Sequence, residues 1–135
     1  MADRQLTTDM IDFFLGFAKN LMESGISEYA RGELALLGYL YFEHDGATPG
    51  ELSIKLEVGT GRIANALKNM EKKGLLIRCP KIEDKRSVGV YITDAGKEIV
   101  EDRKQIVFER VSAMLDKLGP KDAAELIRIV KKLLP

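Results

Sequence analysis

Residues 48–93 limit the possible folds of this chain more than any other part, because two short helical patterns and two β-rich runs follow one another there with only brief breaks. Thr48 offers a hydroxyl that can cap a helix, Pro49 suits a first helical turn, and Glu51 can reach back to complete a capping box. We therefore expect a short helix to begin here, with Leu52 and Leu56 on its apolar side.

A second helical pattern follows the break at residues 57–59. Ile63, Leu67 and Met70 recur at the spacing i, i+4 and i+7, and Gly74 follows two lysines, as is typical of a helix C-terminus. Two short helices joined by a tight turn predict a helix-turn-helix, the motif that places its second helix in the major groove of DNA.

Two β-rich runs come next, Leu75 to Cys79 and Val88 to Thr93, and the polar loop 80–87 separates them. Runs of this length around a polar loop are typical of a β-hairpin. A hairpin directly after a helix-turn-helix is the wing of a winged helix.

The segment 84–96 resembles the wing signature of the MarR family, in which an Asp-x-Arg pair precedes a strand, a Thr and a Gly. Five positions match the signature: Asp84, Arg86, Val90, Thr93 and Gly96. Segments 48–52 and 66–75 are similar to the helix-turn-helix of the same family, and the flanking helices fit its layout across nearly the whole chain. The resemblance implies a dimeric transcriptional regulator that binds double-stranded DNA.

The sequence departs from the family pattern at a few positions that concern local geometry. Ile92 replaces the usual Leu, Glu57 stands where the turn often has Gly, and Gly59 stands where the second helix often has a Ser cap. Gly89 falls inside the second wing strand.

The charge of the chain is segregated although it sums to zero. Residues 1–47 hold 3 basic and 8 acidic side chains, residues 48–93 hold 9 and 5, and residues 94–135 hold 9 and 8. Because a field in salt acts within roughly 10 Å, this local excess matters more for binding a polyanion than the total does. The alternative is a chance excess on a solvated face.

Wide apolar faces mark the helices expected at both ends of the chain. A helix from about Thr8 to Glu23 carries an apolar arc of roughly 200°, which is too wide for a helix lying on a small domain. Similar faces are expected from Asp94 to about Leu118 and from about Lys121 to Leu134, whereas a helix from Ser27 or Gly32 through Tyr41 serves as scaffold. The predicted fold is therefore mainly α with a small β-hairpin wing (α+β), a winged helix-turn-helix with N- and C-terminal dimerisation helices.

We expect one MarR-like domain over residues 1–135. It comprises N-terminal and scaffold helices (1–47), the winged helix-turn-helix (48–93) and C-terminal dimerisation helices (94–135). A symmetric homodimer would set two recognition helices about one duplex turn apart, roughly 34 Å, to read a pseudo-palindromic operator. A coiled coil is a weaker alternative because no strict heptad is sustained.

The expected DNA-binding residues lie on the second helix of the motif and on the wing. Those of the recognition helix are Thr60, Gly61, Arg62, Asn65, Lys68, Asn69 and Lys72. Those of the wing are Lys81, Asp84, Lys85 and Arg86. Arg pairs with guanine and Asn with adenine, whereas lysines suit phosphates, and a solvated polar face is the alternative. The resemblance assigns Arg86 to the minor groove and Asp84 to holding the loop by an ion pair or turn hydrogen bonds.

Catalysis and cofactor binding find little support in the sequence. The only histidine, His44, and the only cysteine, Cys79, fall on separate elements, so we predict no catalytic residues, no metal and no cofactor. We expect His44 to be a capping or exposed residue, and Cys79 to be a structural thiol rather than a redox sensor.

The expected function is a cytoplasmic, ligand-responsive repressor that is not an enzyme. Its partners would be double-stranded DNA, a second copy of the chain and, as the resemblance implies, a small-molecule effector. No apolar run is long enough to span a membrane, and residues 1–6 lack the apolar core of a signal peptide. The competing interpretation is a winged helix that binds proteins without specific DNA binding, since a fold alone does not dictate function.

Overall fold

The computed structural model describes residues 3–22, 28–84 and 86–135. It divides the chain into two compact units. We call residues 25–102 the winged-helix unit, and residues 1–24 with 103–135 the terminal-helix unit.

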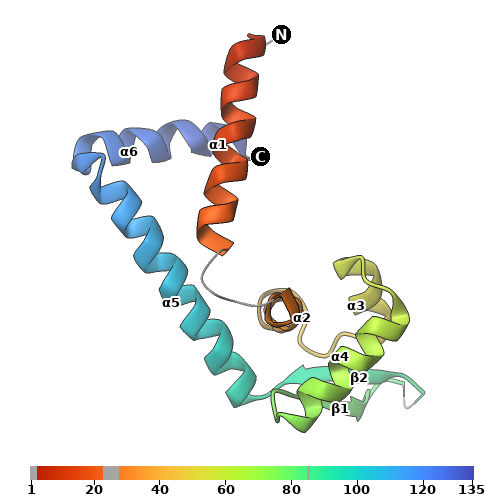
Figure 1. The fold of residues 1–135 in the computed structure, drawn as a ribbon. Coiled ribbons are helices and arrows are strands. Elements are labelled where there is room, and N and C mark those ends of the chain that lie inside the picture. The colour runs from red at the N-terminus through yellow and green to blue at the C-terminus, as the bar shows by residue number, and fades with distance from the viewer. Residues whose placement is uncertain (1–2, 23–27, 85) are drawn as a thin grey trace. The chain divides into compact units, whose positions relative to one another are not determined.

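The winged-helix unit contains three helices, a two-stranded sheet and the beginning of a long helix (Figure 1). The elements are α2 (Glu28–Phe42), α3 (Pro49–Leu56), α4 (Thr60–Lys72), β1 (Leu76–Pro80), β2 (Val88–Ile92) and α5 (Asp94–Asp116). The strands are antiparallel, from the pair Leu76 and Ile92 at the base to Pro80 and Val88 near the loop. A helix-turn-helix followed by a hairpin confirms the predicted winged-helix architecture.

A third chain segment joins the sheet through Ala47, which the sequence patterns did not reveal. Ala47 forms an isolated antiparallel bridge with Val90. Val90 donates to the Ala47 carbonyl and accepts from Gly46 N–H, both at 2.8 Å. This short pairing fixes the segment between α2 and α3 to the wing.

The core of the winged-helix unit comes from one face of each element. Its buried members are Leu36, Leu37, Leu40, Ala47, Leu52, Ile63, Leu67, Met70, Leu75, Leu76, Val90, Ile92 and Val100. The expected stripe of the recognition helix is therefore confirmed. In α2 the sequence pattern singled out Leu34, but Leu36 is the buried residue and Leu34 is half-buried. Because α2 is apolar on nearly every side, periodicity could not choose between them.

The terminal-helix unit consists of α1 (Arg4–Met22), the later part of α5, α6 (Gly119–Val130) and a short 3₁₀ turn, η1 (Lys131–Leu133). Arg110 donates to the Asn20 carbonyl at 2.8 Å, which links α5 to α1 inside this unit. Among the described side chains of α1 and α6, none is buried. No helix within the described ranges is both long and apolar enough to cross a membrane.

Several helix boundaries differ from those expected. The first helix begins at Arg4 rather than Thr8, because the Asp3 carboxylate accepts from the N–H groups of Gln5 and Leu6 at 2.7 and 3.1 Å and caps it. The last helix begins at Gly119 rather than Lys121. Gly119 has φ +80°, so the chain turns sharply between α5 and α6.

Candidate nucleic-acid interface

The start of α3 is capped by Thr48 but not by the full capping box that the sequence predicts. Thr48 Oγ1 accepts from the Glu51 N–H at 3.1 Å, as expected. The Glu51 carboxylate does not reach back to the cap, and that part of the prediction is wrong. It accepts instead from Tyr39 at 2.9 Å and lies 2.6 Å from His44 Nδ1. Partners from α2 and from the segment that follows it have replaced the local one.

This cluster of Tyr39, His44 and Glu51 joins the end of α2 to the beginning of α3. Burial alone raises the pKa of Glu51, but hydrogen bonds from His44 and Tyr39, with the nearby Lys81 charge, outweigh burial and leave that pKa below 4.5. Desolvation by burial is the larger cause and the hydrogen bond to Glu51 the next; together they raise the pKa of Tyr39 above 10.0. His44 is therefore a side-chain partner of Glu51, with 43% of its own side chain exposed.

The turn between α3 and α4 is held by backbone geometry that usually favours glycine. Glu57 adopts φ +53°, the left-handed conformation, at the end of α3. Val58 N–H donates to the Ser53 carbonyl at 3.1 Å, and Ser53 Oγ donates to the Val58 carbonyl at 2.5 Å. These bonds close the turn so tightly that α4 follows within a few residues.

The exposed face of α4 is opposite the core stripe of Ile63, Leu67 and Met70. Thr60, Gly61, Arg62, Asn65, Lys68 and Lys72 are all exposed, and Asn69 is half-buried. A Cβ atom added at Gly61 would have no neighbouring atom within 4 Å. The N-terminal end of α4 is therefore open to close approach by a ligand. Lys73 at the end of α4 is instead paired with Glu33 of α2 at 2.9 Å.

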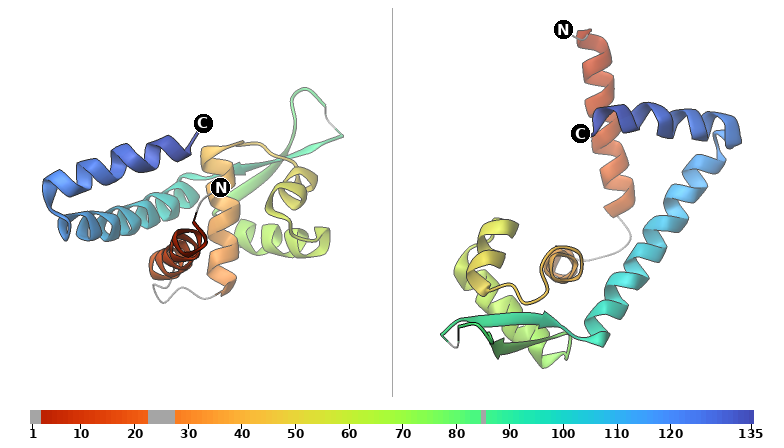
Figure 2. Two further views of the ribbon diagram at one scale, coloured as in Figure 1. Left: turned by 90° about the horizontal axis from the view of Figure 1, so that it is seen from above. Right: turned by 180° about the vertical axis from the view of Figure 1, so that it is seen from behind.

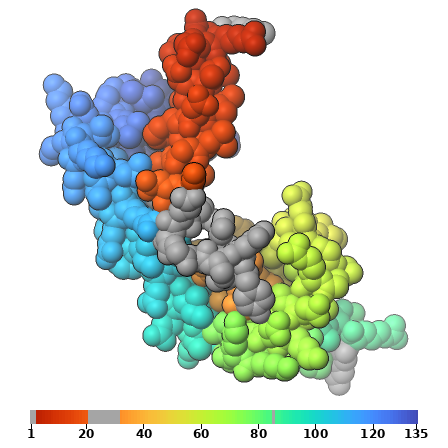
Figure 3. Space-filling view, viewed as in Figure 1, coloured from red at the N-terminus to blue at the C-terminus, as the bar shows by residue number. Residues whose placement is uncertain are grey.

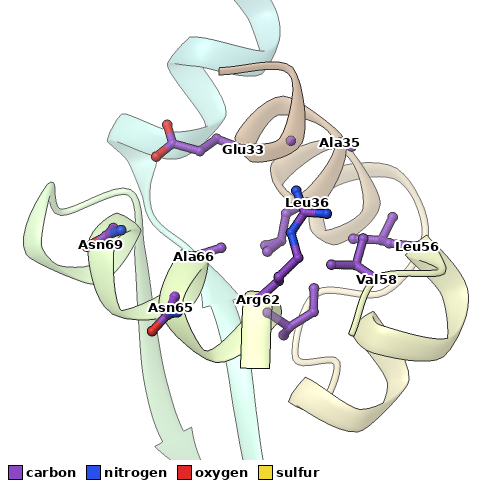
Figure 4. Close-up of a pocket in the computed structure, with 11 residues that line it drawn as sticks. Glu33, Ala35, Leu36, Leu56, Val58, Arg62, Asn65, Ala66 and Asn69 are labelled. Carbon is purple, nitrogen blue, oxygen red and sulfur yellow. The ribbon is translucent and has the colours of Figure 1, made fainter. Parts of the chain in front are cut away.

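One flank of α4 lines a pocket of about 350 Å³ beneath α2 and the α3–α4 turn. Arg62, Asn65 and Asn69 contribute its polar lining from α4, while Leu36 and Val58 form part of its apolar wall. In Figure 4 the Arg62 side chain extends from α4 toward Leu36 of α2. Arg62, Asn65 and Asn69 therefore lie along the side of the recognition helix that borders this pocket.

The wing loop is closed by a compact set of hydrogen bonds. Lys81 N–H donates to the Ser87 carbonyl at 2.9 Å, and Ser87 N–H donates to the Asp84 carbonyl at 3.0 Å. The Asp84 carboxylate accepts from Arg86 N–H at 3.0 Å and from the Ser87 hydroxyl at 3.2 Å. Asp84 thus holds the loop through turn hydrogen bonds, one of the two expected ways, and the Arg86 side chain is exposed.

The remaining wing residues differ in their surroundings. Lys81 is half-buried and close enough to Glu51 to lower its pKa, so it belongs to the base of the loop. Lys85 lies outside the described residues. Cys79 is half-buried in β1 and paired with Gly89 of β2. The sequence patterns missed Ile82, whose side chain is 98% exposed in the loop.

Close contacts explain two glycines, Gly89 of β2 and Gly96 of α5. A Cβ on Gly89 would lie 2.8 Å from the Tyr91 ring and 3.1 Å from the Gly46 carbonyl oxygen. A Cβ on Gly96 would lie 2.3 Å from the Leu75 carbonyl oxygen, where helix α5 meets β1. Thr93 prepares that junction, because its hydroxyl donates to the Gly74 carbonyl at 2.6 Å and accepts from Gly96 N–H at 3.2 Å.

These elements define a winged helix with an exposed, partly basic recognition helix. A model of the MarR family matches residues 32–88. The multiple antibiotic resistance protein MarR of Escherichia coli (strain K12) is 36% identical over 65% of this chain and 62% of its own length. Over this region the chain is similar to the MarR family of regulators. In three of its curated relatives, MarR among them, the matched part spans 55–65% of the relative's length.

Solved structures show the same fold over almost the whole chain. A MarR family protein from Bacillus stearothermophilus superposes on 98% of this chain and 96% of its own, with a TM-score of 0.80 and 20% identity. The complex of Staphylococcus aureus MepR with DNA covers 93% of each chain, with a TM-score of 0.67 and 25% identity.

Proposed function

We propose that this protein is a DNA-binding transcriptional repressor that acts as a homodimer on a pseudo-palindromic operator. The observation that carries the proposal is the face of α4, where Gly61, Lys68 and Lys72 lie exposed opposite a fully buried apolar stripe. A helix held by such a stripe can present its other side to the major groove. The structural similarity to MepR, which was solved in complex with DNA, supports DNA binding by this chain.

The two groups of predicted site residues have different roles in this proposal. Arg62, Asn65 and Asn69 contact base edges from α4, while Lys68 and Lys72 contact phosphates. In the wing, Arg86 enters the minor groove, and Lys81 and Lys85 support it electrostatically. Exposure of Arg86 and the hydrogen bonds that Asp84 makes in the loop are consistent with this division.

The homodimer follows from the apolar side chains of the terminal-helix unit. Helix α1 exposes Leu6, Met10, Ile11, Phe13, Phe14 and Leu15, each by at least 46%. The C-terminal segment exposes Leu126, Ile127, Ile129, Val130, Leu133 and Leu134, each by at least 36%. Apolar surface on this scale usually marks an interface, and a second copy offers the same apolar surface in return.

The test of DNA binding compares Arg86→Ala with Asn65→Ala by fluorescence anisotropy over a salt series. The duplexes are a selected site, its single-base variants and a scrambled sequence. Arg86→Ala removes a positive charge that would contact DNA of any sequence, so both specific and nonspecific binding should weaken. The slope of log affinity against log salt should fall by about one. Losing Asn65 should cost on the order of 1–3 kcal/mol against the preferred base only.

A matched control is Arg128→Ala, which removes the same charge from α6, where Arg128 is paired with Glu125 at 2.6 Å. Its salt slope should equal that of the native protein. If Arg86→Ala leaves nonspecific binding and the slope unchanged, the assignment of the wing is wrong. A native protein that binds no duplex would favour the alternative of a winged helix that binds proteins.

We further propose that a small-molecule effector controls DNA binding through the pocket beneath α2. Its volume of about 350 Å³ is in the range of small-molecule sites, and Arg62, Asn65 and Asn69 connect it to the recognition helix. Ala66→Leu should fill part of the pocket and abolish any ligand-induced release of DNA while leaving DNA binding intact. Release of DNA that persists in Ala66→Leu would place the effector elsewhere.

The chain acts, in this proposal, as one MarR-like domain without enzymatic activity, and it works in the cytoplasm. It requires no cofactor or metal. The relatives it resembles are transcriptional regulators.

A further inference from the structure

Ile82 stands apart from the other large apolar residues of the winged-helix unit. Its side chain is 98% exposed, the highest value among the large hydrophobic residues that the structure describes. Turn positions usually carry polar side chains or glycine, and an isoleucine at such a position gains nothing from the fold. We therefore expect Ile82 to contact a binding partner rather than the core of its own unit.

Hydrogen bonds among its described residues hold the loop that carries Ile82. The bond from Lys81 N–H to the Ser87 carbonyl closes its base directly before Ile82, and the Asp84 carboxylate is occupied by Arg86 N–H and the Ser87 hydroxyl. Figures 2 and 3 show the wing projecting beyond the helices α3 and α4 of the same unit. A side chain at this tip meets any surface that the wing approaches.

Residues around Ile82 limit what that surface can be. Lys81 precedes it, and the exposed Arg86 emerges from the other side of the same closed loop. Glu83 and Asp84 follow Ile82, but the Asp84 carboxylate accepts hydrogen bonds within the loop. An apolar side chain with Lys81 and Arg86 nearby suits a surface with both anionic and apolar parts. The DNA minor groove has these features, because phosphates border it and the apolar faces of deoxyribose rings form its walls, and apolar side chains enter it in several protein classes.

We propose that Ile82 contacts DNA by packing against the deoxyribose walls of the minor groove that Arg86 enters. This inference rests on the proposed function, since it requires the wing to meet DNA. The contact carries no charge and reads no base edge, so it adds affinity that depends on groove width rather than on hydrogen bonds. Arg86 supplies the electrostatic part of wing binding and Ile82 the apolar part.

The first experiment compares Ile82→Ala with Arg86→Ala by anisotropy over a salt series. Ile82→Ala should weaken binding to both selected and scrambled duplexes about three- to tenfold, because part of an isoleucine side chain leaves its contact. Its plot of log affinity against log salt should run parallel to that of the native protein. Arg86→Ala should flatten the same plot. Ile82→Leu should retain most of the native affinity.

The matched control is Ile77→Ala in the same hairpin. Ile77 is 48% exposed and lies near the base of the hairpin, opposite Tyr91. If only the tip meets DNA, Ile77→Ala should bind DNA like the native protein. Circular dichroism of all variants verifies that the hairpin and helices remain folded.

Two charge variants test whether the tip lies close to phosphates. Ile82→Lys should tighten nonspecific binding and steepen the salt slope by about one, and Glu83→Gln should change both in the same direction. Hydroxyl radicals cleave DNA by abstracting deoxyribose hydrogens exposed in the minor groove. The native protein should protect these sugars at the flanks of its site, and Ile82→Ala should lose that protection.

The outcomes separate this inference from the proposed function. If the native protein and Arg86→Ala behave as expected but Ile82→Ala matches the native protein in affinity and protection, the inference is overturned and DNA binding stands. If the native protein shows no DNA binding displaced by salt, the proposed function fails and the inference fails with it.

Discussion

The winged-helix unit and the terminal-helix unit differ in how much of their apolar surface they cover themselves. Every buried hydrophobic residue that the structure describes lies in the winged-helix unit, between Leu36 and Val100. The terminal-helix unit leaves Phe13 and Phe14 of α1 more than half exposed. The winged-helix unit thus has a hydrophobic core of its own. The terminal-helix unit has many large apolar side chains, but they are not buried.

This difference separates two uses of the same kind of residue. In α4 the apolar positions form a narrow stripe and the polar face stays free for a ligand. In α1 the apolar positions cover a broad arc, and the Phe13 ring contacts those of Phe14 and Phe17 with centroids 5.8 and 5.6 Å apart. A narrow stripe specifies packing within a chain, whereas a broad arc requires a second surface to cover it.

The largest expected effect comes from placing a charge in the uncovered region. Phe14→Glu should weaken self-association about a hundredfold or more, because an unpaired carboxylate would have to be buried in an apolar interface. Light scattering over a dilution series measures the change in oligomeric state.

A matched control for this prediction is Ile54→Glu, since Ile54 is 76% exposed on α3 of the winged-helix unit. This variant should remain dimeric. If Phe14→Glu remains a soluble dimer at low concentration, the exposed apolar surface of α1 is not the dimer interface.

The second effect concerns the core at the junction of β1 and α5. Gly96→Ala should lower the free energy of unfolding by about 3 kcal/mol, since the added Cβ would meet the Leu75 carbonyl oxygen at 2.3 Å and backbone cannot easily retreat. Urea denaturation at one fixed protein concentration measures the loss, because stability of a dimer depends on concentration.

Gly38→Ala in α2 is the control for Gly96→Ala. A Cβ at Gly38 meets nothing within 4 Å, so this substitution should stabilise the helix by about 0.5–1 kcal/mol. Equal effects from the two substitutions would show that the junction is less tightly packed than its distances indicate.

Local signals in the sequence predicted much of the winged-helix unit. The cap at Thr48, the glycine at Gly74 with φ +74° and the cap at Thr93 each act on neighbouring residues, so a short segment suffices to recognise them. The role of Glu51 was predicted wrongly because its partners come from outside α3: Tyr39 from α2, and His44 from the segment after α2. Long-range partners are not contained in a local pattern.

The candidate site shows the same limit. Periodicity correctly separated the buried and exposed faces of α4, because the face of a helix follows from its period alone. It could not show that Arg62 would lie beside a pocket under α2, since that depends on how two helices pack. Contacts of these residues with DNA, and of the terminal helices with a second copy, remain predictions.

A smaller effect is expected at the α3–α4 turn. Glu57 holds φ +53°, a conformation that costs a side-chain-bearing residue about 1 kcal/mol, so Glu57→Gly should stabilise the protein by about 0.5–1 kcal/mol. Gly74→Ala, at φ +74° with open space around it, should destabilise by a similar amount. Thermal unfolding of both variants tests the pair, and a loss of stability in Glu57→Gly would assign the Glu57 side chain a role of its own.

An effect of similar size, which depends on pH, should appear at Glu51, which links α2 to α3. Hydrogen bonds from His44 and Tyr39 outweigh burial and lower the pKa of Glu51 below 4.5, so folding favours its ionised form. The resulting stabilisation is present above about pH 4.5 and is lost as the pH falls through the lowered pKa.

Glu51→Gln should therefore be less stable than the native protein by about 0.5–1 kcal/mol near neutral pH, a modest value because 30% of the Glu51 side chain is exposed. The difference should shrink as the pH falls below 4.5 and through the lowered pKa of Glu51. Urea denaturation of both proteins between pH 3 and 7 measures it, and a difference that stays constant across this range would mean that Glu51 stabilises the junction by shape rather than by charge.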